Sequence, residues 1–189
     1  TPSENTLHGV TDYGDNTDYL VLDTATGTVD DATMWQDTTP TSTVWSIGTN
    51  HQVNADGENY IAYCFANSQF ISVGEFLGNE NVNGPYVSTV NSLGVPIQPT
   101  FVMIKNTTQS RSWNVWDIKR SPFNVSQNLL EWDYVQAEQT GSTYFIDIVT
   151  GGFKPRGTHE LLNGAEQMLY FAMGSPIIDT SGRIIAGKL

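Results

Sequence analysis

The chain has 189 residues, enough to bury the core of one large β domain or of two small ones. Its 39% hydrophobic and 11% aromatic content excludes a wholly disordered chain. The 8 Lys and Arg against 20 Asp and Glu give a net charge of -12, and every Lys and Arg lies beyond residue 100. Because nucleic-acid affinity comes largely from cations that neutralise phosphates, we expect no nucleic-acid partner. We interpret the acidity as a solubility feature, with a calcium requirement or a basic partner as alternatives.

Cys64 is the single cysteine, so no intrachain disulfide can form. It lies within the apolar run at residues 60–66, which predicts a small buried side chain rather than a nucleophile. No run approaches the roughly 20 apolar residues of a membrane span, so we expect no membrane partner. No charged-then-apolar leader follows Thr1, and we expect the chain to be a fragment or a processed product.

Short runs of β-branched and aromatic residues, separated by Gly, Asn, Asp and Ser clusters, predict many short strands joined by turns. The expected strands lie, in chain order, at residues 19–22, 43–47, 60–66, 70–76, 100–105, 113–118, 144–149 and 168–172. Asp56-Gly57, Gly151-Gly152 and Asn163-Gly164 predict reversals, since these residues tolerate positive φ. A short helix is expected around residues 128–138. The whole pattern predicts an all-β fold, an antiparallel β-sandwich that is jelly-roll-like.

An internal echo suggests a partial repeat. The apolar runs at residues 20–23, 44–47 and 60–66 are followed in the same order and at similar spacing by those at residues 129–133, 145–148 and 168–172. We therefore expect three parts: residues 1–66 as the C-terminal part of a first β repeat, residues 67–176 as a complete second β-sandwich repeat, and residues 177–189 as a C-terminal extension. Chance similarity between β-rich segments is the alternative.

Five motifs stand in order within the predicted second repeat. They read GEFLGN at 74–79, QPTFVMIKN at 98–106, WDIKR at 116–120, GFK at 152–154 and YFAMGSP at 170–176. They resemble the G-x-Y-x-G-N, Q-P-x-F-V-x-I-K-N, x-D-x-x-R, G-F-x and Y-x-A-F-A-x-x-P motifs of a β-rich repeat domain in virion structural and tail-fibre proteins of tailed phages, especially those of marine bacteria. Residues 60–66 supply the only match in the first repeat. Residues 88–97 depart from the family, because they form a longer stretch than its T-G-F.

The resemblance implies a non-enzymatic structural component of a bacteriophage particle, such as a tail fibre, a capsid decoration or another surface appendage. It implies partners among other virion proteins and a homo-oligomer, with a trimer favoured. A carbohydrate-binding adhesin that contacts a host surface glycan is the alternative, and a polysaccharide depolymerase domain is a third, less favoured reading. The resembling family carries no catalytic motif, so no catalytic residue is transferred to this chain.

Several groups of side chains are candidate sites. Two carboxylate pairs, Glu131 with Asp133 and Asp147 with Glu160, have the residue types that a glycosidase needs, but an acidic chain places such pairs on its surface anyway. Residues 54–59 (NADGEN) hold oxygen ligands of the kind that calcium prefers, yet they lack EF-hand spacing and are better explained as a turn. Asp30-Asp31 is equally ambiguous. We expect no cofactor, with calcium as a weak alternative.

The five tryptophans could offer faces on which sugar rings stack, although packing in the core is the expected role of most of them. Trp113 and Trp116 are the candidate ligand-binding residues. Residues three apart in a strand point to opposite faces, so both cannot lie in one core, and we expect one of the two to be exposed or at an interface.

Overall fold

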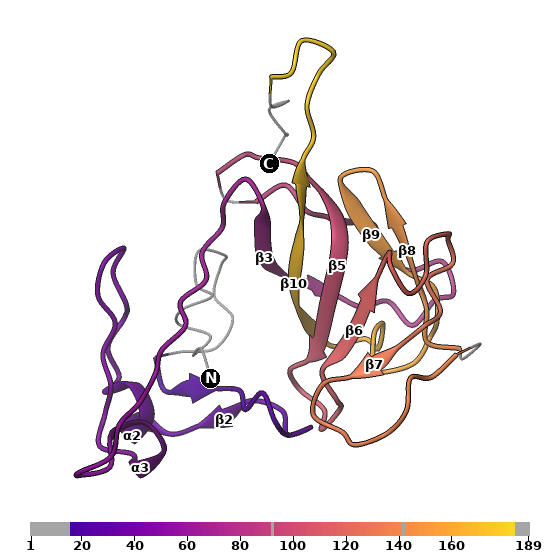
Figure 1. Ribbon diagram of the computed structural model, residues 1–189. Helices are drawn as coiled ribbons and strands as arrows, with labels where there is room; N and C mark the ends of the chain where they lie inside the picture. The colour runs from indigo at the N-terminus through magenta and orange to yellow at the C-terminus, as the bar shows by residue number, and fades with distance from the viewer. Residues whose placement is uncertain (1–15, 92, 141–142, 184–189) are drawn as a thin grey trace.

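The computed structural model describes residues 16–91, 93–140 and 143–183, and it is mostly β (Figure 1). The N-terminal strands are β1 (Asp18–Tyr19) and β2 (Val29–Asp30), and the helices are α2 (Ala32–Trp35) and α3 (His51–Asn54). The remaining strands are β3 (Ile71–Leu77), β4 (Val87–Ser88), β5 (Ile97–Asn106), β6 (Asn114–Asp117), β7 (Leu130–Glu131), β8 (Ile146–Val149), β9 (Gly152–Pro155) and β10 (Gln167–Pro176).

Two antiparallel sheets enclose the main core. The larger has the strand order β3-β10-β5-β6-β7 and the smaller has the order β4-β9-β8. Both sheets contribute side chains to one hydrophobic cluster, which includes Val102, Trp116, Phe153 and Tyr170. The arrangement is consistent with a β-sandwich.

The two long strands β5 and β10 are apolar on both of their faces. Val102 and Ile104 of β5 are completely buried between the sheets, as are Met168 and Ala172 of β10. Because side chains alternate along a strand, the intervening residues of both strands point to the outer face of the larger sheet. A strand that is apolar on both faces requires a cover on each of them.

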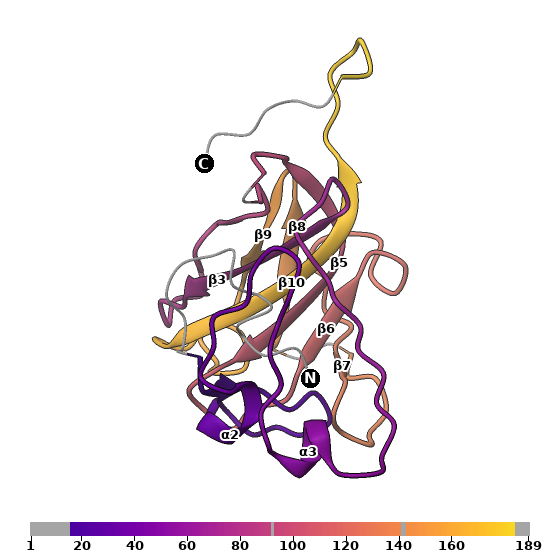
Figure 2. The same cartoon turned by 90° about the vertical axis from the view of Figure 1, so that its left-hand side faces the viewer.

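The N-terminal residues supply part of that outer cover. β1 and β2 form a two-stranded sheet, and Tyr19, Met34 and Trp35 form a small cluster of their own beside it. From there Leu20 reaches across to pack on the outer face of the larger sheet. Figure 2 shows α2 and α3 below the larger sheet, and the chain that follows α3 passes in front of the outer face of that sheet.

The two short helices begin at side chains that cap them. Asp31 accepts a hydrogen bond from the backbone N–H of Thr33 at 2.8 Å, and Asn50 accepts one from that of Gln52 at 2.9 Å. Asn50 also donates to Asp31 at 2.9 Å, which ties the two helical turns together.

Most predicted strands of residues 67–176 are confirmed, and several earlier elements are corrected. Residues 43–47 and 60–66 form no strand, and only β1 remains of the strand expected at 19–22. The helix expected at 128–138 is also wrong, because that stretch holds β7 and turns. Cys64 is exposed rather than buried, since its segment does not enter a sheet. The expected repeat itself stays a prediction; residues 1–15 of its first part and 184–189 of the extension lie outside the described residues.

Candidate functional site

Trp113 and Trp116 lie on opposite faces of the larger sheet. Trp116 is completely buried between the sheets, where its indole N–H donates to the carbonyl of Tyr144 at 3.3 Å. Trp113 packs on the outer face against Leu20 and Leu169. The predicted divergence is confirmed. Trp113 is only 6% exposed, so neither ring is exposed in the single chain, and the alternative that one of them lies at an interface stays a prediction. Because the two rings lie on opposite faces of the sheet, they cannot contact one ligand together. Ligand binding by either of them stays a prediction.

An apolar hollow of about 330 Å³ opens on this outer face. Its walls include Phe65, Phe101, Trp113, Trp132, Leu169 and Phe171. The ring of Phe171 meets those of Phe65 and Phe101 edge to face, with centroids 5.4 and 6.4 Å apart. Almost no polar atom lines the hollow, so it cannot offer the hydrogen bonds that orient a sugar or a charged ligand. It suits apolar side chains of another protein segment.

Sequence reasoning missed this hollow, although a signal for it is present. Residues 101–104 and 168–173 are continuous apolar runs rather than alternating ones. Such runs indicate strands covered on both faces, and they therefore predict a second apolar layer outside the sheet. The contributions of Leu20 and Phe65 could not be predicted, because they come from segments that are distant in the sequence.

Lys105 lies beside the hollow and is completely buried. Its ammonium donates to the carbonyl oxygens of Asn106 at 2.7 Å and Ala25 at 3.3 Å, and it lies 5.9 Å from the centre of the Trp113 ring. Burial lowers the pKa of Lys105 to about 8, although the charge of Asp133 partly opposes this shift. The Trp113 indole also donates to the carbonyl of Val21 at 2.9 Å. Lys105 and Trp113 therefore fasten residues 21–25, which follow β1, to the larger sheet.

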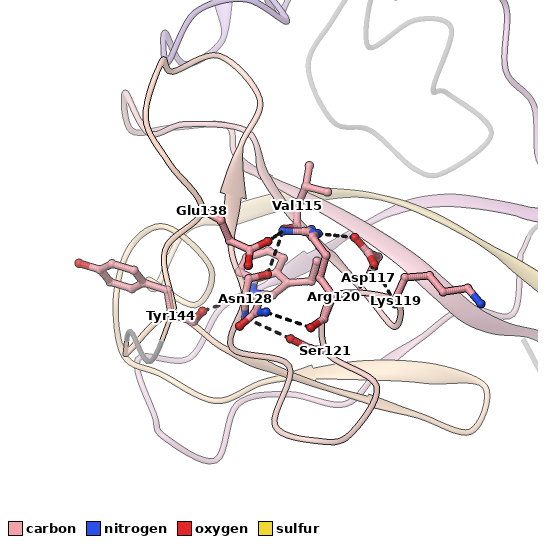
Figure 3. Close-up of polar contacts among 9 residues, drawn as sticks. Val115, Asp117, Lys119, Arg120, Ser121, Asn128, Glu138 and Tyr144 are labelled. Atoms are coloured by element: carbon pink, nitrogen blue, oxygen red, sulfur yellow. Dashed lines mark hydrogen bonds and ion pairs between the residues drawn. The ribbon is translucent and has the colours of Figure 1, made fainter.

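A second polar cluster surrounds Arg120 just after β6 (Figure 3). The guanidinium pairs with Asp117 at 2.5 Å and Glu138 at 3.1 Å, and it donates to the carbonyls of Val115 and Asn128 at 3.0 and 3.2 Å. Burial would raise the pKa of Asp117, but the Arg120 side chain and the nearby backbone N–H groups hold that pKa below its usual value. Every one of these contacts is internal, so the cluster closes a loop rather than presenting a free charge.

A third polar cluster centres on Asn163, whose side chain is buried. Its amide donates to the Asn79 side chain at 3.0 Å and to the carbonyls of Asn81 and Gly157, both at 2.8 Å. Gly78 lies so close that an added Cβ would be 1.8 Å from the carbonyl oxygen of Gly164. The Gly78-Asn79 pair therefore locks the end of β3 onto the loop before β10.

The candidate carboxylates are all engaged with neighbours. Asp147 pairs with Arg156 at 2.6 Å, and Glu160 pairs with Arg111. The hydrogen bond and the charge of Arg111 lower the pKa of Glu160, whereas a catalytic acid needs a raised pKa.

The other carboxylate pair supports its own loop. Glu131 accepts hydrogen bonds from Gln136 and from Gln139, the latter at 3.2 Å. Asp133 accepts one from the backbone N–H of Trp113 at 2.8 Å. All four carboxylates thus support loops and strands.

The candidate calcium ligands also have local roles. Asp31 caps α2, and Asp30 accepts a hydrogen bond from the Thr17 hydroxyl at 2.6 Å. Within residues 54–59, Asn54 ends α3, and Asp56 and Gly57 form a turn in which Gly57 has a φ of 77°. Among the described residues no group of three or more His, Cys, Asp or Glu could hold a metal ion. Within the same ranges no helix has the length and hydrophobicity needed to cross a bilayer.

Comparison with known proteins places the chain in one family. The sequence model of DUF7483, described as a domain of unknown function, matches residues 3–175. The chain belongs to this family. The match runs across the expected boundary between residues 66 and 67 and carries no function with it. No curated protein and no solved structure matches the chain.

Proposed function

We propose that this chain is a non-enzymatic structural subunit of a bacteriophage particle, part of a tail fibre, a capsid decoration or another surface appendage. The observation that carries the proposal is the role of the residues that bear the phage resemblance. Gly78 and Asn79 lock a loop, Lys105 joins two layers, and Asp117 pairs with Arg120. These motifs specify a scaffold, as expected of a protein whose work is to be built into a particle.

The apolar hollow supports the same role. An exposed surface with aromatic walls and almost no polar lining is typical of contacts between proteins. We infer partners among other virion proteins and further copies of this chain, with a trimer favoured by the resemblance. A jelly-roll-like connectivity belongs to the proposal as well. It is supported by β3 and β10, which are neighbours in the larger sheet although they are the first and last strands of the sandwich in chain order.

Purified particles of a phage that encodes this chain provide the test. Mass spectrometry should find the chain in gradient-purified particles in multiple copies, and immunogold labelling should place it on the particle surface. A phage-encoded enzyme that acts only inside the infected cell is the control and should be absent. A chain that is abundant in the infected cell but missing from the particles would refute the structural role.

A glycan-binding adhesin remains the second candidate, and the loop after β7 favours it. Trp132 and Tyr134 are exposed there beside Glu131, Gln136 and Gln139, which combines aromatic faces with hydrogen-bonding groups. A glycan array tests this reading with the wild type, Trp132→Ala and the control Trp45→Ala, another exposed tryptophan. Binding that Trp132→Ala abolishes and Trp45→Ala leaves intact would support an adhesin, and no binding would remove this candidate. If the chain instead shortens a host polysaccharide in solution, the depolymerase reading is supported.

A further inference from the structure

Residues 60–66 (YIAYCFA) form an extended, apolar segment on the surface. Every residue from 56 to 66 is exposed, and Ile61 and Tyr63 keep 82% and 75% of their surface in solvent. The segment runs between the 330 Å³ hollow, to which it contributes Phe65, and a second hollow of about 560 Å³ beside Trp45 and Ile47. So much exposed apolar surface in one continuous stretch indicates an interface.

The main chain of this segment has no partner strand. Among the described residues, no backbone N–H or C=O of residues 61–66 takes part in a hydrogen bond. The segment nevertheless has the composition of a strand, and it echoes residues 168–172 of β10. β10 is paired on both sides, with β3 and with β5. Residues 60–66 therefore have the side chains of a paired strand and none of its hydrogen bonds.

The charge pattern indicates what kind of strand can approach. No Asp, Glu, Lys or Arg occurs from Asn59 to Gly74, in a chain whose net charge is -12. Exposed strands of monomeric proteins are commonly protected by charged residues or proline, and residues 60–66 contain neither. Two identical segments of this kind can meet without placing like charges opposite each other.

We propose that residues 60–66 of two copies of this chain pair as antiparallel strands across a two-fold axis. A two-fold contact between identical segments is self-complementary, so it needs no other partner. With Tyr63 at the axis, Ile61 of each copy lies opposite Phe65 of the other. This inference deepens the proposed structural role by naming the partner. It yields dimers, which distinguishes it from the trimer that the resemblance implies.

Solution mass of the full chain against concentration, by sedimentation and light scattering, provides the test. The wild type should form a dimer as its concentration rises. Ile61→Lys should weaken that dimer at least about tenfold, because it buries an unpaired ammonium at the contact. The matched control is Phe123→Lys, which replaces another apolar side chain that is 82% exposed and should leave the dimer unchanged. Circular dichroism checks that both variants remain folded.

Cys64 offers a second readout that needs no substitution. In the proposed dimer the two Cys64 residues lie within roughly 10 Å of each other, so a short bismaleimide should join them. Three results would each overturn the proposal. The wild type could stay monomeric, its oligomer could be left intact by Ile61→Lys, or both variants could weaken the dimer equally. A trimer that is indifferent to Ile61→Lys would overturn it while leaving the structural role in place.

Discussion

Among single residues, Arg120 joins several parts of the loops after β6. It satisfies two carboxylates and two backbone carbonyls from a half-buried position. Arg120→Lys keeps the charge but loses the fork geometry that reaches several acceptors at once. We expect it to lower the free energy of unfolding by about 2–3 kcal/mol, measured by urea denaturation.

The matched control for this prediction is Arg183→Lys. Arg183 is 84% exposed and pairs with Asp179 at 3.7 Å, so its replacement should change stability by less than about 0.5 kcal/mol. The pKa of Asp117 is below its ordinary value of 3.8 in the folded state. The stabilisation from its ionised form is therefore present above that value and is lost as the pH falls through the lowered pKa. The gap between wild type and Arg120→Lys should shrink in the same acidic range, and a gap unchanged by acid would contradict the assigned pairing.

Lys105 gives the second residue-scale prediction. The pKa of Lys105 is about 8 in the folded chain, against an ordinary value of 10.5 that applies to the unfolded chain. Between these two pH values the unfolded chain therefore binds the proton more tightly. Stability contributed by this group should therefore rise as the pH increases from 8 toward 10.5. Relative to Lys105→Met, the wild type should gain about 1–2 kcal/mol between pH 7 and pH 10, measured by urea denaturation. An equal response of both proteins to pH would show that the ammonium is not buried.

At the scale of elements, β10 holds the larger sheet together because it pairs with β3 and β5. Its register with β5 shifts between Met173 and Gly174, and a Cβ on Gly174 would lie 1.9 Å from the carbonyl oxygen of Gln98. Gly174→Ala must therefore separate the two strands at this bulge. We expect a loss of about 2–4 kcal/mol in thermal or urea unfolding, against less than about 0.5 kcal/mol for the neighbouring exposed Ser175→Ala. Equal stability of the two variants would refute the close approach.

The strands also show how far the sequence predicts the fold. The apolar runs at residues 100–105 and 168–172 predict strands buried on both sides, and they lie in β5 and β10. Residues 43–47 and 60–66 have similar side chains and form no strand. The difference is the presence of a partner strand, which composition does not encode. α2 and α3 were missed because a single turn held by one capping side chain leaves no periodic signal.

The candidate site was predictable only in part. The divergence of Trp113 and Trp116 follows from the two-residue period of a strand. The burial of Trp113 depends on a covering layer that includes Leu20 and Leu22, far away in the sequence. The hydrogen bonds between Asn163 and Asn79 could not be predicted from the sequence either, because they join loops that only the assembled sheets bring together.

At the scale of the whole molecule, charge is the least balanced property. Residues 1–100 contain 12 Asp and Glu and no Lys or Arg, whereas residues 101–189 contain 8 of each sign, so the first part accounts for the entire net charge of -12. The acidic side chains of residues 1–100 repel one another. Salt shortens the screening length of this repulsion, from roughly 30 Å at 0.01 M to about 8 Å at 0.15 M ionic strength. Salt should therefore stabilise the fold and favour contacts between copies.

Thermal unfolding at low and high sodium chloride measures this effect. We expect the wild-type Tm to rise by roughly 2–5 °C with salt, since screening removes repulsion that the folded state suffers more than the extended chain. Asp56→Asn should raise the low-salt Tm and reduce its salt dependence, because it removes one acid from the N-terminal layer while keeping a residue that suits the turn at Gly57. Asp179→Asn removes the same charge from the balanced part and breaks the pair with Arg183, so it should give no such gain. If both variants respond to salt as the wild type does, the acidity acts through a bound cation or partner rather than through repulsion within the chain.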